Sequence, residues 1–315
     1  MTWSVRALLV VSVLLGTQTG VAETFDPGIA GFEIGIRGQR NPYRVLGLFA
    51  RPDETVELEL PGAEFVAFDS DGAKTGARQT DRLLNWTAPS RPGLVSLEIR
   101  RIGEDQGMTL NVFVLVPSER VQGGRLGGYR IDTYPARPLR GLERYRAPAG
   151  FVEVTPENGE TPLSPHFRLK QFMCKQEGGP PRYVVLHERL LLKLELVLQA
   201  VNERGFRAET LHVMSGYRTP FYNRAIGNVQ YSRHVYGDGA DLFVDSSPRD
   251  GVMDDLDGNG TIDVRDAKLL FEIGDGLEEG DEAQLVGGLA AYPATAAHGP
   301  FVHLDVRGYR ARWGR

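Results

Sequence analysis

Histidine and aspartate residues in the last third of the chain have the spacing of a metal site. His234 and Asp241 lie seven residues apart in the segment SRHVYGDGAD, whose two glycines favour a tight turn over a helix. The segment FVHLDV predicts a strand in which His303 and Asp305 share one face. A hydrolytic zinc site takes three nitrogen or oxygen ligands from the protein and keeps a fourth position open for water. His234, Asp241 and His303 would meet that count.

The motifs around these residues resemble those of a known peptidase family. The pattern Ser-x-His-x-x-Gly-x-x-x-Asp followed by Val-His-x-Asp is similar to that of the M15-type zinc D-Ala-D-Ala peptidases. It resembles more closely the murein endopeptidases that carry Phe-Val-His-x-Asp near the end and a closing Arg-Trp, here Arg312-Trp313. The segments LSPHFRL and SGYRTPFYN agree with this family, so the resemblance spans about Ser164 to Trp313.

The resemblance implies a fold and a set of roles. The fold is an α+β zinc peptidase domain of the D-Ala-D-Ala carboxypeptidase or hedgehog type, which we expect over residues 161–315. His234, Asp241 and His303 would be the zinc ligands. Arg218, at the family's Ser-Gly-Tyr-Arg position, would hold a substrate carboxylate or the oxyanion that develops during amide hydrolysis. The alternative for Arg218 is a structural salt bridge.

The general base is less directly indicated. Many relatives place a carboxylate three residues before the last histidine ligand, where this chain has Pro300, which cannot act as a base. His298 lies five residues before His303, as does a catalytic histidine in some related zinc murein endopeptidases. Asp305 is the other candidate, or it orients the imidazole of His303 from behind. We expect His298 to be the base and Asp305 the orienting group. His166, His187 and His212 lie outside this pattern, and we assign them structural places.

The implied reaction is attack of a zinc-activated water on a peptide carbonyl, with a nearby base completing the deprotonation. The implied substrate is the stem or cross-link peptide of peptidoglycan, and both endopeptidase and carboxypeptidase action remain open. Pro300 also keeps open a catalytically inactive zinc- and calcium-bearing cell-wall binding protein on the same fold. A third hypothesis, a calcium-dependent adhesion module, leaves the histidine motifs unexplained.

A second metal signal lies between Asp241 and His303. The segment DLDGNGTIDVRD fits a calcium loop, with a glycine at the sharp turn and an apolar residue at position 8. Its aspartate at position 12 resembles dockerin-type loops, but only one loop is present, so we expect no cohesin partner. The predicted calcium ligands are Asp255, Asp257, Asn259, Thr261 (through its carbonyl), Asp263 and Asp266. We interpret residues 250–282 as an insertion that calcium either stabilises or switches.

The start of the chain predicts export. Residues 1–22 combine Arg6, a short apolar stretch and small residues before Glu23, as a secretory signal peptide does. The apolar stretch is too short to span a bilayer, and no later run approaches that length. We therefore expect secretion across the inner membrane, to the periplasm or cell envelope. A single cysteine, Cys174, excludes an intramolecular disulfide and four-cysteine zinc sites.

The elements that must position these residues fall into two parts. Short strands punctuated by turns predict an N-terminal all-β sandwich over residues 23–118, and WTAPSRPGLV resembles the end of bacterial Ig-like repeats. The candidate strands are 43–50, 54–60, 64–69, 95–101 and 109–116. Residues 119–160, rich in Gly, Arg and Pro, predict a linker or extended arm. An apolar stripe at helical spacing predicts a helix over 186–204, and 211–214 predicts a buried strand.

The charge is unevenly distributed. The net charge of the 315-residue chain is −5, which argues against a nucleic-acid partner. Residues 250–282 contain 12 Asp and Glu against 2 Lys and Arg, so the rest of the chain carries a net +5. A basic body with an acidic insertion suits an anionic wall polymer better than the average charge suggests.

Overall fold

The computed structural model describes residues 25–62, 64–69, 78–80, 82–104, 107–278 and 285–314. The predicted signal peptide lies outside the described residues. Among the described residues, no helix is both long and apolar enough to cross a membrane.

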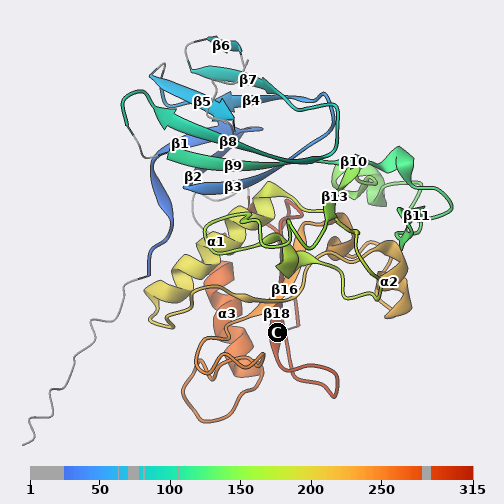
Figure 1. Ribbon diagram of the computed structural model, residues 1–315. Helices are drawn as coiled ribbons and strands as arrows, with labels where there is room; N and C mark the ends of the chain where they lie inside the picture. The colour runs from blue at the N-terminus through green and yellow to red at the C-terminus, as the bar shows by residue number, and fades with distance from the viewer. Residues whose placement is uncertain are drawn as a thin grey trace, which may run out of the picture.

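Two facing β-sheets form the N-terminal part (Figure 1). One sheet has the order β2 (Gln39–Tyr43), β1 (Ile29–Ile36), β4 (Thr55–Glu59), β7 (Leu83–Thr87) and β6 (Arg78–Thr80). The other has the order β3 (Val45–Ala50), β9 (Gly107–Val114), β8 (Gly93–Arg101) and β5 (Phe65–Asp69). Alternation in β4 buries Val56 and Leu58 while its glutamates face solvent, so apolar residues of both sheets meet in one core. The assignment to the Ig-like class remains a prediction.

One predicted strand is divided. Residues 43–50 were expected to form a single strand, but β2 ends at Tyr43 and β3 begins at Val45 in the other sheet. At the division, the Arg44 N–H donates to the Gly28 carbonyl, and the Asn41 side chain accepts from the Tyr43 N–H. These bonds satisfy the backbone where the chain crosses between sheets. The strands β1 and β7 were not predicted.

Residues 119–160, predicted as a linker or extended arm, form an arm that packs on the C-terminal part. They include η1 (Ser118–Arg120), β11 (Arg125–Leu126), β12 (Tyr129–Arg130), η2 (Leu139–Gly141), η3 (Glu143–Tyr145) and β13 (Gly150–Val154). β13 pairs with β10 (Val116–Pro117) and with β14 (Arg182–Val184). Leu126, Tyr129, Ile131 and Phe151 are buried in the core of the C-terminal part. Burial of these apolar side chains fixes the arm although its composition is typical of a loop.

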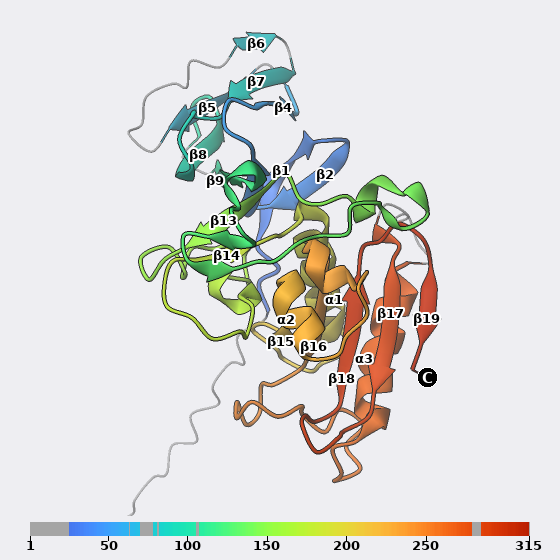
Figure 2. The ribbon, with the colours of Figure 1, turned by 90° about the vertical axis from the view of Figure 1, so that its right-hand side faces the viewer.

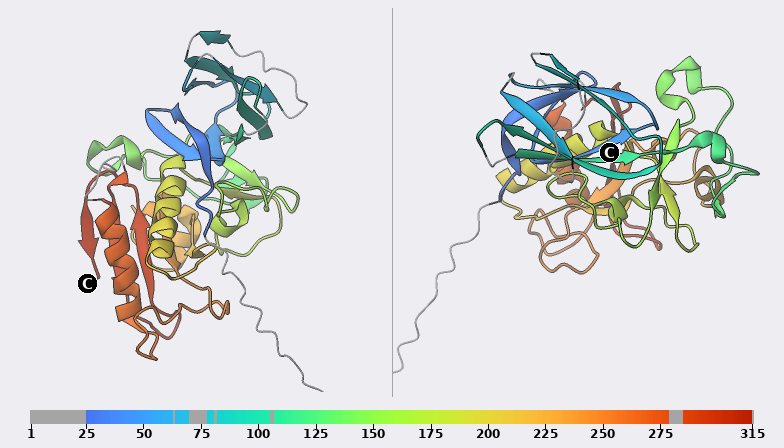
Figure 3. Two further views of the ribbon diagram at one scale, coloured as in Figure 1. Left: turned by 90° about the vertical axis from the view of Figure 1, so that its left-hand side faces the viewer. Right: turned by 45° about the horizontal axis from the view of Figure 1, so that its top comes forward.

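The C-terminal part is built on one mixed sheet backed by helices (Figures 2 and 3). The strand order is β15 (His212–Ser215), β16 (Gly239–Phe243), β18 (Phe301–Asp305), β17 (Gly288–Tyr292) and β19 (Ala311–Trp313). All neighbours are antiparallel except β17 and β19. The remaining elements are η4 (Leu169–Phe172), α1 (Glu188–Glu203), α2 (Pro220–Ala225), η5 (Arg233–Tyr236) and α3 (Val264–Leu277).

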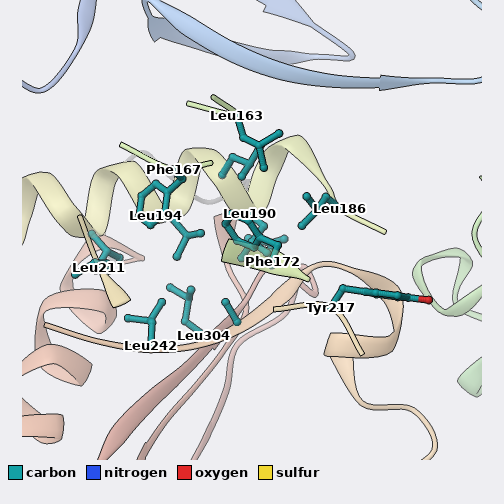
Figure 4. Close-up of a cluster of buried hydrophobic side chains, with 14 of the residues drawn as sticks. Leu163, Phe167, Phe172, Leu186, Leu190, Leu194, Leu211, Tyr217, Leu242 and Leu304 are labelled. Carbon is teal, nitrogen blue, oxygen red and sulfur yellow. The ribbon is translucent and has the colours of Figure 1, made fainter. Parts of the chain in front are cut away.

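The helix expected over 186–204 is α1, and its apolar stripe explains the core. α1 packs against α3, and α3 packs on β17 and β18. Figure 4 shows Leu190 and Leu194 of α1 across from Leu242 of β16 and Leu304 of β18. These four leucines are almost fully buried, and deleting one such side chain typically costs about 2–5 kcal/mol. The helices thus cover the sheet face that carries Leu242 and Leu304. The alternate residues of β16 and β18 point to the opposite face.

Candidate metal centre

The loop that carries His234 is held in shape by a buried ion pair and a left-handed glycine. His234 lies in η5, which ends at Gly237 with φ 74°. A Cβ at Gly237 would lie 2.2 Å from the Val185 carbonyl oxygen, so only glycine fits there. Arg233 pairs through two nitrogens with Asp238, and both residues are buried. The turn predicted from the glycines is therefore closed by the ion pair between the Arg233 guanidinium and the Asp238 carboxylate.

The packed arm holds this loop from outside. The Arg233 guanidinium donates to the Arg144 carbonyl at 3.1 Å and lies over the ring of Tyr145 at 4.3 Å from its centroid. Tyr145 meets Tyr236 edge to face, and the Tyr134 hydroxyl donates to the Val235 carbonyl at 3.2 Å. These contacts join residues about 90 positions apart in the sequence. The arm thus helps to hold the loop that carries His234.

The sheet brings Asp241 and His303 together. Asp241 of β16 is the register partner of His303 of β18, and His303 is in turn opposite Ala290 of β17. The row continues to Ser215 of β15 on one side and to Trp313 of β19 on the other. Because side chains alternate along a strand, this row points away from the face that the helices cover.

The three predicted ligands converge on one point. His234 Nε2 lies 3.1 Å from Asp241 Oδ1 and 3.2 Å from His303 Nδ1, and the last two atoms are 2.9 Å apart. Ligands about 2.0–2.1 Å from a tetrahedral zinc ion lie about 3.3 Å from one another. The side chains are buried, with relative exposures of 2, 4 and 6% for His234, Asp241 and His303. The residues present therefore fit a zinc ion in type, number and spacing.

Each ligand is oriented by a partner on its far side. His234 Nδ1 donates to the Gly216 carbonyl at 2.7 Å, which leaves Nε2 free to bind a metal. His303 Nε2 contacts Asp305 Oδ2 at 3.1 Å, which turns Nδ1 toward the other ligands. Asp241 presents Oδ1 because its Oδ2 accepts from Arg218. Such outer partners are characteristic of metal-binding histidines and carboxylates.

Burial and the neighbouring groups shift the pKa values of all three residues. Burial lowers the pKa of His234. Burial alone would also lower the pKa of His303, but its bonds to Asp241 and Asp305 raise it to about 9. Burial would raise the pKa of Asp241, but the neighbouring histidines hold it well below its usual range. The directions for His234 and Asp241 favour a neutral imidazole and an ionised carboxylate, the forms in which these two groups bind a metal ion.

Arg218 makes the salt bridge that was the structural alternative to a role in substrate binding. Its Nη2 pairs with Asp241 Oδ2, and its Nε donates to Ser215 Oγ at 2.8 Å. The side chain is nearly buried beside the ligand cluster. Arg218 therefore fixes the ligand carboxylate, and this contact depends on the pairing of Ser215 with Asp241 across β15 and β16.

His298 stands apart from the cluster. It lies in the loop between β17 and β18, where its ring meets Phe301 edge to face and its Nδ1 contacts the Gly299 carbonyl at 2.8 Å. No contact joins it to the three ligands within the described part of the chain. Phe301 shares a strand face with His303, so His298 lies on the same side of the sheet, beyond Phe301. Asp305, by contrast, contacts His303 directly.

The predicted calcium loop brings three of its carboxylates together. Carboxylate oxygens of Asp255, Asp257 and Asp266 lie within 4.8 Å of one another. Asp263 instead caps α3 and pairs with Arg265, and the Asn259 amide donates to Asp257. Thr261 is exposed. Positions 1, 3 and 12 of the loop are therefore brought together, position 5 bonds to position 3, and the carboxylate of position 9 pairs with Arg265.

The sequence assigned no role to two residues that contact His303 or its partner Asp305. Trp313 lies with its ring 5.4 Å from that of His303, and Arg307 bonds to Asp305. Trp313 was visible only as part of the closing Arg-Trp pair. The contact between Arg307 and Asp305 could have been inferred from their spacing, since the two residues are two positions apart.

Replacing Gly237 by alanine tests whether the turn positions His234. The matched control is Gly227→Ala, because Gly227 has φ 72° but open space around its missing Cβ. Both changes carry the left-handed penalty of about 1–2 kcal/mol. Only Gly237→Ala displaces the loop, so we expect its zinc affinity, measured by competition with a chromogenic chelator, to fall about tenfold or more. Equal zinc affinity in the two variants, with both folded by circular dichroism, would contradict this role.

Comparison with known proteins supports part of the resemblance. Residues 165–263 match a family model described as Peptidase M15. The matched stretch contains Arg218, His234 and Asp241 and ends before His303. No curated protein matches the chain.

A solved structure titled as a polysaccharide lyase is 14% identical to this chain, with 80% of this chain covered and a TM-score of 0.23. The chain spans 32% of the length of that structure, and a likeness at this score carries no argument. The match over residues 165–263 suggests a peptidase of the M15 type, a family of metallopeptidases, and the His-Asp-His cluster is a possible metal site of the kind that such enzymes use.

Proposed function

We propose that this protein is an exported zinc peptidase that hydrolyses peptide bonds in peptidoglycan stem or cross-link peptides. The observation that carries the proposal is the triangle of His234 Nε2, Asp241 Oδ1 and His303 Nδ1, with sides of 2.9–3.2 Å. Two imidazoles and one carboxylate would hold the ion through three protein ligands, the number that hydrolytic zinc sites use. The match to the M15 peptidase model supports the reaction class.

The residues around the cluster would bind the ion, orient its ligands and accept the proton of the water. Zinc, when bound, supplies the Lewis acidity that makes water a nucleophile near neutral pH. His234, Asp241 and His303 hold the ion, and Gly216, Arg218 and Asp305 orient these three ligands. His298 is our proposed base, and it would have to approach from beyond Phe301.

The charge of the arm supports the proposed substrate, and the predicted signal peptide supports the proposed location. Residues 120–146 of the arm contain seven arginines and two acidic residues, and all seven arginines are exposed. A surface of this kind attracts polyanions, including wall polymers that carry carboxylates and phosphates. The predicted signal peptide supports action outside the inner membrane.

A second candidate function is a zinc- and calcium-bearing wall-binding protein without turnover. Pro300 favours it, because this residue occupies the position at which many relatives place a catalytic carboxylate. Among the described residues, His298 has no contact with the cluster, which favours it as well. Both candidate functions use the same metal ligands and differ in whether peptide is released.

We also propose that residues 255–266 bind calcium. The full loop pattern of the sequence and the convergence of Asp255, Asp257 and Asp266 support the site. Asp266 lies at the start of α3, which packs on the strands β17 and β18. Calcium would therefore stabilise the helix that supports the strand of His303.

Digestion of purified peptidoglycan tests the main proposal. We expect the zinc-loaded wild type to release peptide fragments that mass spectrometry identifies, and His234→Ala to release none, because a ligand is lost. His187→Ala is the control, since His187 is exposed and outside the ligand cluster. Retention of the wild type on insoluble peptidoglycan without release, across several wall chemistries, would support the second candidate instead.

Replacement of His298 tests its role as the base. Loss of a general base typically reduces the rate by about 10²–10⁴-fold, so we expect His298→Ala to lower kcat within that range. Zinc content should stay at the wild-type level, because His298 makes no contact with the ligands. A variant that retains full kcat would exclude His298 as the base.

Thermal unfolding with and without calcium tests the loop. A ligand that binds only the folded state raises the melting temperature, so we expect calcium to stabilise the wild type. Asp257→Ala should lose most of this rise. Asp250→Ala is the control, because Asp250 is an exposed acidic residue of the same insertion outside the loop. An equal rise in all three proteins would place calcium elsewhere.

A further inference from the structure

Arg307 is bonded to the carboxylate behind His303 through both its side chain and its backbone. Its Nε lies 2.9 Å from both oxygens of Asp305, and its Nη2 lies 2.5 Å from Oδ2. Its backbone N–H donates to Asp305 Oδ1 at 3.0 Å. A guanidinium that bonds both oxygens of a carboxylate fixes the plane of that carboxylate as well as its position.

Asp305 is fully buried, and its remaining acceptor capacity is used. The Gly288 N–H donates to Oδ1 at 2.7 Å, and Oδ2 contacts His303 Nε2 at 3.1 Å. The Lys193 ammonium group, also buried, donates to the Asp305 carbonyl at 3.0 Å. The contact to His303 is thus the one bond of this carboxylate that reaches a proposed zinc ligand.

Arg307 is itself held by aromatic rings. Its guanidinium lies 5.0 Å from the ring centroid of Trp313 and 5.7 Å from that of Tyr309. Trp313 packs against His303 on its other flank and donates from Nε1 to the Tyr292 hydroxyl at 2.6 Å. A planar guanidinium can stack and bond in two directions at once, whereas an ammonium group cannot.

We infer that Arg307 is a positioning residue of the metal centre, which locks Asp305 so that His303 presents Nδ1, and not Nε2, to the ion. The inference rests on the proposed zinc site. Arg307 touches neither the ligand cluster nor a substrate position, and it acts through Asp305 and His303. Without the Arg307 side chain, Oδ1 of Asp305 keeps its two backbone donors, but Oδ2 loses the guanidinium that fixes it toward His303 Nε2. The bond that selects the metal-binding nitrogen of His303 is then weakened.

The test compares the wild type with Arg307→Ala and Arg307→Lys. We expect Arg307→Ala to weaken zinc binding by about 10- to 100-fold in chelator competition, as loss of an outer partner does. Arg307→Lys keeps the charge but loses the two-point bond, so we expect only partial recovery. Arg310→Lys is the matched control, since it makes the same change three residues later in an exposed side chain that pairs with Asp275.

A spectroscopic measurement separates positioning from a merely structural role. In protein loaded with ¹¹³Cd and labelled with ¹⁵N-histidine, we expect the wild type and Arg310→Lys to show ¹⁵N–¹¹³Cd coupling to Nδ1 of His303. Arg307→Ala should show reduced or mixed coupling at this ring, while coupling to Nε2 of His234 persists. A purely structural role would lower the melting temperature and leave the coupling pattern unchanged.

The outcomes distinguish this inference from the proposed function. Wild-type metal affinity and unchanged His303 coupling in a folded Arg307→Ala would overturn the inference, whether or not the protein cleaves peptidoglycan. Metal binding that depends on Arg307, in a wild type that releases no peptide, would support the inference and overturn the peptidase proposal. If Arg307→Ala does not fold, Arg307→Lys decides by the same two measurements.

Discussion

The register between β16 and β18 is the constraint on which the site depends. It sets Asp241 opposite His303, on the sheet face that the helices leave uncovered. Because side chains alternate, a slip of one residue would turn one of these side chains into the leucine-rich core and destroy the pair. The same core resists that slip, since it would expose Leu242 or Leu304. The packing that stabilises the sheet therefore also specifies the positions of two of the three ligands.

His234 reaches this pair from outside the sheet, and ion pairs hold the three residues and the orienting Asp305 in place. Arg233 and Asp238 close its loop, Arg218 pairs with Asp241, and Arg307 pairs with Asp305. Burial alone would raise the pKa of Asp305, but its bonds to His303 and Arg307 hold it well below its usual range, so it stays ionised. Removing one member of such a pair leaves an uncompensated buried charge, so each pair resists rearrangement. The ligand atoms are consequently preorganised.

The sequence predicted the features that depend on residue type and local spacing. The cluster of His234, Asp241 and His303 could be predicted because two imidazoles and a carboxylate occupied recognisable motifs. The helix α1 could be placed from its apolar stripe. The partner of Arg218 could not be known, because it depends on the pairing of β15 with β16. The position of His298 depends on a loop, and the loop composition of residues 119–160 concealed Tyr129 and Phe151, which anchor the arm in the core.

The third ligand follows Asp241 by 62 residues, while the first two are seven apart. Joining distant segments costs chain entropy that rises with the logarithm of the interval. Here α3 lies within that interval and packs on β18, and the two ends are neighbours because β16 pairs with β18. During synthesis, the growing chain contains His234 and Asp241 well before it contains His303. Arg307 and Trp313, which lie beside Asp305 and His303, are added later still. The centre is thus assembled late, and an unfinished chain has two ligands without the strand that completes them.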